Sequence, residues 1–319
     1  MSEQLWAPIV AALVVSVMGA VLSVFVVLKR LAFIGQGVSH AAFGGVGIAL
    51  LLGLHGVTAA GQVGQMAVVV AFSVAAALYI AALTRAQKGR TDTAIGVVLS
   101  ASMALGFVLF AINESRHEHP EPAMVQAEHD HDHDHDHAGH DHGGGGASGH
   151  SDEHHVIEEI LFGNILETDW PRAGTAVVVA VGLIAAVWWM RRKLIFWAFD
   201  EPVCDAFGVN GQRMTNVLLV VLAIAVVMSM QVVGVILAAA VLVLPGAAAL
   251  NLSSNLRGVF AWSVVVALVG CVVGLWVGLA SGYPTGPCIV LAQTGCYLLS
   301  RATQSTLVRR AGLAGIPSA

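Results

Sequence analysis

Charged residues are scarce in this chain. Lys, Arg, Asp and Glu together make up 11% of the 319 residues, whereas a soluble domain carries about 25%. Hydrophobic residues make up 57%, and several apolar runs reach the roughly 18–20 residues that one bilayer-spanning helix needs. The scarcity of charge excludes an ordinary soluble domain, and the sequence predicts an all-α polytopic membrane protein.

Several motifs are also missing, and each absence excludes a function. No GxxxxGK(S/T) motif occurs, so the chain has no P-loop with which to bind ATP. No HExxH motif occurs, which argues against a zincin-type membrane protease. The four cysteines form no CxxC pair and are interpreted as small apolar residues. The basic residues are dispersed in short loops, which argues against nucleic acid as a partner. We therefore expect a chain that is not itself an enzyme.

Apolar runs predict where the membrane spans lie. They fall at about 5–28, 38–54, 62–84, 93–113, 173–190, 214–250, 258–280 and 287–300. The first run lacks the basic start of a signal peptide, so we expect it to be retained as a span. The run 214–250 is too long for one helix across a core of roughly 30 Å and short for two. We expect eight or nine transmembrane helices, one of them broken or re-entrant.

The Lys and Arg residues orient these spans, because cytoplasmic loops are enriched in them. If 214–250 crosses the membrane twice, 13 of the 15 basic residues lie on the cytoplasmic side, leaving only Arg116 and Arg172 outside. A single crossing would move the four arginines that follow this run to the other side. The distribution favours two crossings, and it places the connection between the fourth and fifth spans outside the cell.

That connection is a strongly acidic, histidine-rich insert over residues 114–160. It holds 13 of the 20 acidic residues and 12 of the 14 histidines, and its aliphatic content is too small for a core, so we expect disorder. Imidazole suits zinc, copper or nickel, and carboxylate suits harder ions such as manganese. We interpret the insert as a metal-capture loop in preference to a solvated spacer with incidental histidines. Its candidate ligands are His129, His131, His133, His135, His137, His140 and His142.

The second span carries a histidine inside the membrane. In "GQGVSH", Gln36 and His40 are one helical turn apart and share a face. An intramembrane ionisable residue is a candidate for a transport pathway. The alternative is a histidine hydrogen-bonded to a neighbouring helix, which the small residues Gly44 and Gly45 would allow to approach closely. From these residues alone, both interpretations stay open.

Five other stretches complete a pattern with "GQGVSH". In chain order they are "DTAIG" (92–96), "LFGNIL" (161–166), "FDEPVCDAFGVN" (199–210), "GVILAAAVLVLPGAAAL" (234–250) and "PTGPCIVL" (284–291). In order and spacing, the six resemble the membrane permease of ATP-binding-cassette (ABC) importers for zinc and manganese. The resemblance covers nearly all of the chain except the insert, and it implies the architecture of an ABC-importer permease in the bacterial cytoplasmic membrane.

The resemblance also implies partners and a cargo. A separate ATPase subunit would bind the ATP, an extracytoplasmic metal-binding protein would deliver the metal, and a second permease copy would complete a homodimer or pseudo-dimer. No permanently bound cofactor is implied. The acid and the histidine that line the pathway in this family map to Gln36 and His40, with Ser39 beside them. Since a hard carboxylate is missing, we expect zinc first, and manganese or iron next.

The segment at about 196–212 is implied to be the coupling segment that docks on the ATPase. Asp200 and Glu201 beside Pro202 also predict the start of a helix. The residues expected to couple are Phe199, Asp200, Glu201, Ala206 and Gly208.

Two other functions stay open at this point. A secondary metal transporter would need no ATPase, and a membrane-anchored metal buffer or sensor would use the insert itself. In each case the organisation is the same: four spans over 1–113, the insert over 114–160, and the remaining spans with the coupling segment over 161–319.

Overall fold

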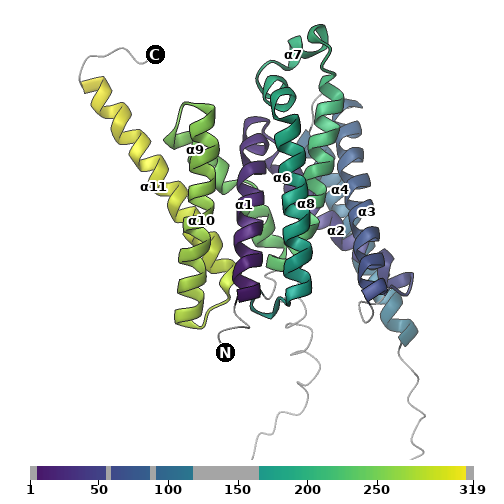
Figure 1. Cartoon of the computed structure of the whole chain (residues 1–319). Helices are drawn as coiled ribbons and strands as arrows, with labels where there is room; N and C mark the ends of the chain where they lie inside the picture. The colour runs from purple at the N-terminus through teal and green to yellow at the C-terminus, as the bar shows by residue number, and fades with distance from the viewer. Residues whose placement is uncertain (1–5, 55–58, 87–90, 118–164, 314–319) are drawn as a thin grey trace, which may run out of the picture.

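A computed structural model of the chain describes residues 6–54, 59–86, 91–117 and 165–313. These residues fold into helices packed side by side, and no β-strand occurs among them (Figure 1). The long helices are α1 (Trp6–Leu28), α2 (Ala32–Leu51), α3 (Ala59–Ala86), α4 (Thr91–His117), α6 (Trp170–Phe199), α8 (Gly211–Val241), α10 (Leu256–Ser281) and α11 (Thr285–Leu313). The short ones are η1 (Ile165–Glu167), α7 (Glu201–Cys204), η2 (Asp205–Phe207) and α9 (Leu244–Leu252).

The apolar runs of the sequence become the long helices, as predicted. Within the described ranges, seven helical segments are long and apolar enough to cross a membrane, the longest being Gly211–Leu252. α11 is more polar on average, but it lies along α10: a Cβ atom on Gly274 would be 2.3 Å from the Cα atom of Ile289. The prediction of a polytopic α-helical membrane protein is confirmed.

The segment Gly211–Leu252 reverses direction at Gly234. This glycine has φ 78° and ψ 168° inside α8, a conformation that costs a glycine little and other residues much. Beyond it the chain follows α1 in parallel, since Val241 lies against Gly19 and Gly246 lies against the Ser23 backbone. The segment therefore crosses twice. Counted as two crossings, it raises the candidate spans of the described residues from seven to eight, within the eight or nine that the sequence predicts.

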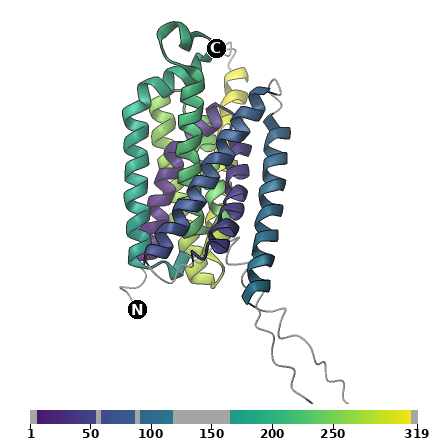
Figure 2. The same ribbon diagram turned by 90° about the vertical axis from the view of Figure 1, so that its right-hand side faces the viewer.

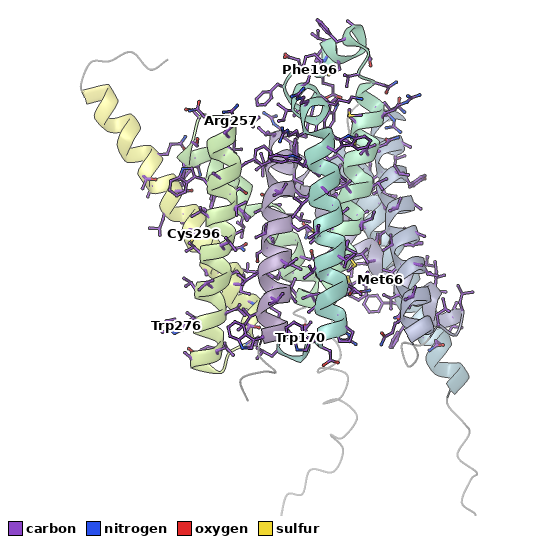
Figure 3. The ribbon with its side chains drawn as sticks, viewed as in Figure 1. Met66, Trp170, Phe196, Arg257, Trp276 and Cys296 are labelled. Atoms are coloured by element: carbon purple, nitrogen blue, oxygen red, sulfur yellow. The ribbon has the colours of Figure 1, made fainter. Side chains whose placement is uncertain are left out.

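The double crossing brings the basic residues to one end of the bundle, which we call the basic end (top of Figure 1). Here Arg85 Nη1 donates to Asn216 Oδ1 at 3.3 Å, and Asn251 Nδ2 donates to the hydroxyl of Ser300 at 3.2 Å, next to Arg301. Figure 3 shows Arg257 at the same end, with Trp170 and Trp276 towards the other. The prediction that the arginines after 214–250 share an end with Lys29 is confirmed for Arg257 and Arg301.

Two helices extend beyond the apolar runs that predict them. α4 continues to His117, past the expected boundary at 113, and α6 continues to Phe199, so the expected coupling segment begins inside it. Both extensions contain residues such as Glu, Arg, Lys and Leu, which favour a helix whether or not lipid surrounds it. Hydropathy locates the membrane crossing but not the end of the helix.

Small and hydroxyl residues hold the inner helices together. The Ser263 hydroxyl of α10 donates to the carbonyl of Ala20 in α1 at 2.7 Å, and the Ser23 hydroxyl donates to the same carbonyl at 2.8 Å. A Cβ atom on Gly246 would be 2.6 Å from the Ser23 carbonyl. Such close contacts replace the hydrophobic driving force, which is absent between helices in lipid.

Candidate metal pathway and coupling segment

The three predicted pathway residues lie on α2, in the turns that follow its start at the basic end. Gln36 is exposed, His40 is half-buried and Ser39 is fully buried. Phe33 is exposed as well, and residues 33, 36 and 40 follow the spacing of one helical face. This face of α2 is open in the single chain, whereas Ser39 is buried within it.

Ser39 is satisfied by its own helix. Its hydroxyl donates a 2.9 Å hydrogen bond to the carbonyl of Gly35, one turn earlier. This is how serine hydroxyls inside apolar helices commonly find a partner. The structure therefore separates Ser39 from the face that carries Gln36 and His40.

His40 differs from Ser39, because one of its ring nitrogens makes no hydrogen bond. Its Nδ1 atom is buried and has no hydrogen-bond partner in the described part of the chain. A buried polar atom without a partner is costly, and in native proteins each such atom calls for an explanation. The alternative left open by the sequence, a hydrogen bond from this nitrogen to a neighbouring helix, is not observed. An unpaired imidazole nitrogen is also a common metal ligand.

Glycines bring α2 close to both of its main neighbours, α3 and α4. A Cβ atom on Gly45 would be 2.9 Å from the Cα atom of Val69 in α3, and one on Gly44 would be 3.1 Å from the carbonyl oxygen of Ser102 in α4. The close approach expected after His40 is thus present. Figure 2 shows the result: α2 lies behind α3, with α4 at the edge of the bundle.

The two candidate ligands on this face of α2, Gln36 and His40, carry no negative charge. Over the described residues, no three His, Cys, Asp or Glu side chains are grouped in a way that could hold a metal ion. The carboxylate side chains that the structure describes belong to helix ends and connections, and they are Asp92, Asp169, Asp200, Glu201 and Asp205. Gln36 and His40 therefore offer neutral ligands, and a single copy of the chain forms no complete metal site from its described side chains.

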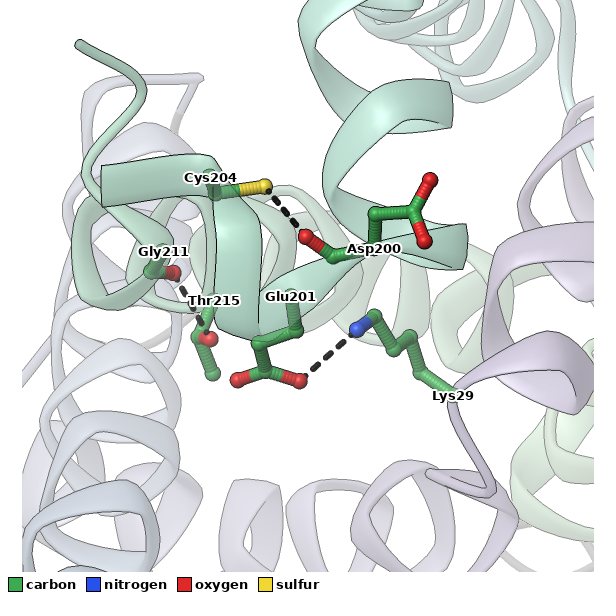
Figure 4. A network of polar contacts seen from close by, with 6 residues as sticks. All are labelled: Lys29, Asp200, Glu201, Cys204, Gly211 and Thr215. Carbon is green, nitrogen blue, oxygen red and sulfur yellow. Dashed lines mark hydrogen bonds and ion pairs between the residues drawn. The ribbon is translucent and has the colours of Figure 1, made fainter. Parts of the chain in front are cut away.

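The expected coupling segment, residues 196–212, lies at the basic end, and its connection 200–210 projects there between α6 and α8 (Figure 1). The short helix α7 begins at Glu201 with Pro202 in its first turn, so the predicted helix start is confirmed. The Asp200 side chain does not cap this helix, but its carbonyl accepts a 3.2 Å hydrogen bond from the Cys204 thiol (Figure 4). Burial raises the pKa of Cys204, so its thiol stays protonated and unreactive at neutral pH.

Gly208 ends the coupling segment's second short helix and turns the chain towards α8. Its φ of 74° lies in the left-handed region, and its N–H donates to the carbonyl of Asp205. Asn210 then caps α8 by accepting a 2.9 Å hydrogen bond from the backbone N–H of Arg213. Ala206 and Gly208 are both exposed, and Gly208 also has this structural role.

The coupling segment exposes apolar side chains, two of which were not predicted. Phe199, Val203 and Phe207 are 60%, 44% and 72% exposed, and Phe207 also packs edge-on against Phe196 with ring centroids 5.7 Å apart. The sequence predicts a coupling role for Phe199 but not for Val203 or Phe207. Their spacing of four residues is a signal that could have identified them. Glu201 forms an ion pair with Lys29 (Figure 4), and its expected role in coupling stays a prediction.

The predicted capture ligands His129 to His142 lie outside the described residues. The ends that flank residues 118–164 belong to α4 and η1, and α4 ends opposite the basic end (Figure 1). The capture role stays a prediction.

Comparison with known proteins gives the same architecture. A manganese transport system membrane protein (MntC) of Listeria monocytogenes is 24% identical over 292 residues, covering 92% of this chain and 88% of the relative. A chelated iron transport system membrane protein (YfeD) of Yersinia pestis is 28% identical, covering 89% of this chain and 80% of the relative. Among solved structures, PsaBC from Streptococcus pneumoniae is 25% identical with a TM-score of 0.68, covering 92% of this chain and 89% of that chain.

The sequence model of the ABC 3 transport family matches residues 1–121 and 148–304. The two stretches exclude part of the histidine-rich insert and take in the long helices. The resemblance seen in the six motifs is therefore confirmed, and the chain belongs to the ABC 3 transport family, as a membrane permease of the metal ABC importer type.

Proposed function

We propose that this chain is the permease subunit of an ATP-driven importer that carries a divalent transition metal across the bacterial cytoplasmic membrane. The observation that carries the proposal is His40, an intramembrane imidazole whose buried Nδ1 has no partner among the described residues. Membership of a transport family supports a permease over a metal buffer or sensor, and over a secondary transporter that needs no ATPase.

The energy comes from a separate ATPase subunit, because the chain has no P-loop. The exposed apolar side chains of Phe199, Val203 and Phe207 support docking of that subunit at the basic end. Basic residues favour the cytoplasmic side of a membrane, so the basic end is the cytoplasmic end. The insert that follows α4 is then extracytoplasmic, where it receives metal together with a metal-binding protein.

A second copy of the chain completes the pathway. The face of α2 with Phe33, Gln36 and His40 is partly open, and the neutral ligands of a single copy form no complete site. In a homodimer that joins these faces, two imidazoles and two amide oxygens would line one passage. A conductor needs ligands that bind a cation weakly enough to release it, and neutral ligands meet that requirement.

Two observations bear on the identity of the metal, and they favour different metals. The relatives are named for manganese and iron transport, which supports one of these metals. The candidate ligands on α2, an imidazole and an amide, include no carboxylate, which suits zinc better than manganese. We propose the transition-metal class, and a single measurement ranks its members.

The test is reconstitution of the permease with its ATPase in liposomes, with ATP hydrolysis and metal uptake followed for Mn²⁺, Fe²⁺ and Zn²⁺. We expect at least one metal to stimulate hydrolysis and to accumulate in an ATP-dependent manner. The metal with the strongest response is the cargo. Uptake that persists with an ATPase subunit whose P-loop lysine is replaced would refute the proposal in favour of a secondary transporter.

A further inference from the structure

One side chain joins the coupling segment to the start of the pathway helix. Lys29 directly follows the last residue of α1, and its Nζ atom lies 2.8 Å from Oε2 of Glu201, the first residue of α7 (Figure 4). The same Nζ lies 4.0 Å from the centroid of the Trp197 ring, near the end of α6. The Lys29 side chain is 11% exposed, compared with 57% for Glu201. Lys29 is therefore held from two directions by α6 and α7.

The two partners of Lys29 belong to one stiff unit. Trp197 is buried, and Gly211 at the start of α8 lies next to it: a Cβ atom on Gly211 would be 3.5 Å from Cδ1 of the Trp197 ring. The backbone N–H of Gly211 donates to Oδ1 of Asp205, which fastens the far end of the coupling segment. A displacement of the coupling segment therefore carries Glu201 and Trp197 with it.

On its other side, Lys29 is three residues from α2. The connection is tight: the backbone N–H of Leu31 donates to the carbonyl of Val26 at 2.8 Å, and α2 begins at Ala32. Arg30, between Lys29 and α2, has φ 56°, in the left-handed region that L-residues with side chains rarely adopt. Little slack remains between Lys29 and the turns of α2 that carry Gln36 and His40.

We propose that Lys29 is a positioning residue that transmits movement of the coupling segment to α2, so that a step of the ATPase changes the position of His40. Glu201 then acts within the chain and not as a contact with the ATPase. The inference rests on the proposed function and deepens it. Partly exposed ion pairs contribute little to stability. The Lys29–Glu201 pair therefore affects the coupling between the coupling segment and α2 more than it affects folding.

The test is Lys29→Met in the complete complex of permease and ATPase in liposomes. We expect the ATPase to co-purify as before and metal-stimulated hydrolysis to persist. Metal uptake per ATP hydrolysed should fall by about tenfold, a usual size for coupling between two sites. Lys29→Arg should recover most of the uptake, because it restores a cation beside Glu201 and over Trp197.

Glu201→Gln is the second variant, and it keeps the test valid if Lys29→Met lowers the yield of folded protein. It should reduce uptake per ATP in the same way. The double variant should be no worse than the stronger single one, because both remove one interaction. Arg85→Met is the matched control: Arg85 also bridges two helices at this end, but it contacts Asn216 of α8.

Uptake per ATP unchanged in Lys29→Met would overturn the inference. So would loss of the ATPase from the complex in Glu201→Gln, since that would make Glu201 part of the docking surface. Failure of the proposed function has a separate signature: the unaltered complex would show neither metal-stimulated hydrolysis nor ATP-dependent uptake.

Discussion

The neighbouring helices α2 and α4 have opposite characters. In its most apolar stretch, α2 has a mean hydropathy of 1.3, and 61% of that stretch is buried. The corresponding stretch of α4 has a mean hydropathy of 2.4, and 22% of it is buried. The more apolar helix is the more exposed one. In a soluble protein the order would be reversed. In a membrane, apolar side chains can face the lipid, and the contacts between helices are made by small and polar residues that pack or bind.

The side chains show how this difference arises. α4 exposes Leu105, Phe107 and Val108, while Gly106 between them is buried against α2. α2 presents glycines to both neighbours and keeps Gln36 and His40 on its remaining face. Small residues therefore bring the polar helix inside, and the apolar ones shield it from lipid.

The largest effect is expected where α4 meets α2. A Cβ atom on Gly106 would be 3.0 Å from the carbonyl carbon and oxygen of Phe43, which are backbone atoms and cannot turn aside. Gly106→Val should destabilise the fold by at least about 1–3 kcal/mol, with loss of monodisperse protein on size exclusion and a lower Tm. Gly96→Val on the same helix is the control, because a Cβ atom there meets nothing within 4 Å. Equal behaviour of the two variants would contradict the packing described for α4.

A loss of function without loss of fold is expected on the open face of α2. His40→Ala removes the unpaired imidazole, so uptake in the reconstituted complex should fall by about 100-fold or more, exceeding the loss caused by an outer partner of a metal ligand. The Tm and the co-purification of the ATPase should be unchanged. Ser39→Ala is the matched control, because the Ser39 hydroxyl is satisfied by Gly35 in its own helix. Normal uptake with His40→Ala would remove this residue from the pathway.

The sequence was sufficient for the features that depend on local composition. Run length and the distribution of arginines predicted the double crossing of 214–250, and the structure adds that Gly234 makes the reversal. A lone intramembrane histidine identified α2 as the helix to examine. Both signals rest on the cost of charge and polar groups in lipid, which is large enough to dominate other preferences.

Features that depend on distant residues were not predictable. Lys29 and Glu201 are 172 positions apart, and nothing local in the sequence indicates that they form an ion pair. The sequence places Ser39 beside His40, but it does not show that the Ser39 side chain is buried and that its hydroxyl donates to the Gly35 carbonyl. The helix ends at His117 and Phe199 were not predicted, because hydropathy gives no signal of where a helix of polar helix-forming residues stops.

A moderate effect is expected from the insert that follows α4. Deletion of residues 128–142 should lower uptake by up to about tenfold when metal is scarce, because a charged collector raises the local concentration of cations. Uptake at ample metal should be unchanged, since the pathway on α2 remains. Replacing the histidines of this stretch by Asn keeps its length and acidic charge, and so separates imidazole binding from electrostatic attraction. Complete loss of uptake at every metal concentration would place the essential site in the insert and reverse the ranking of the two regions.

The smallest effect is expected on the lipid face of α4. Phe107 is exposed beside the buried Gly106, and Phe107→Leu replaces one apolar group by another in contact with lipid. The free energy of unfolding should change by less than about 0.5 kcal/mol, as for surface substitutions that touch no special feature. Thermal unfolding followed by size exclusion measures it alongside Gly106→Val, one residue away. A large loss of stability with Phe107→Leu would mean that this face of α4 packs against protein and not lipid, and the contrast between α2 and α4 would then belong to the isolated chain only.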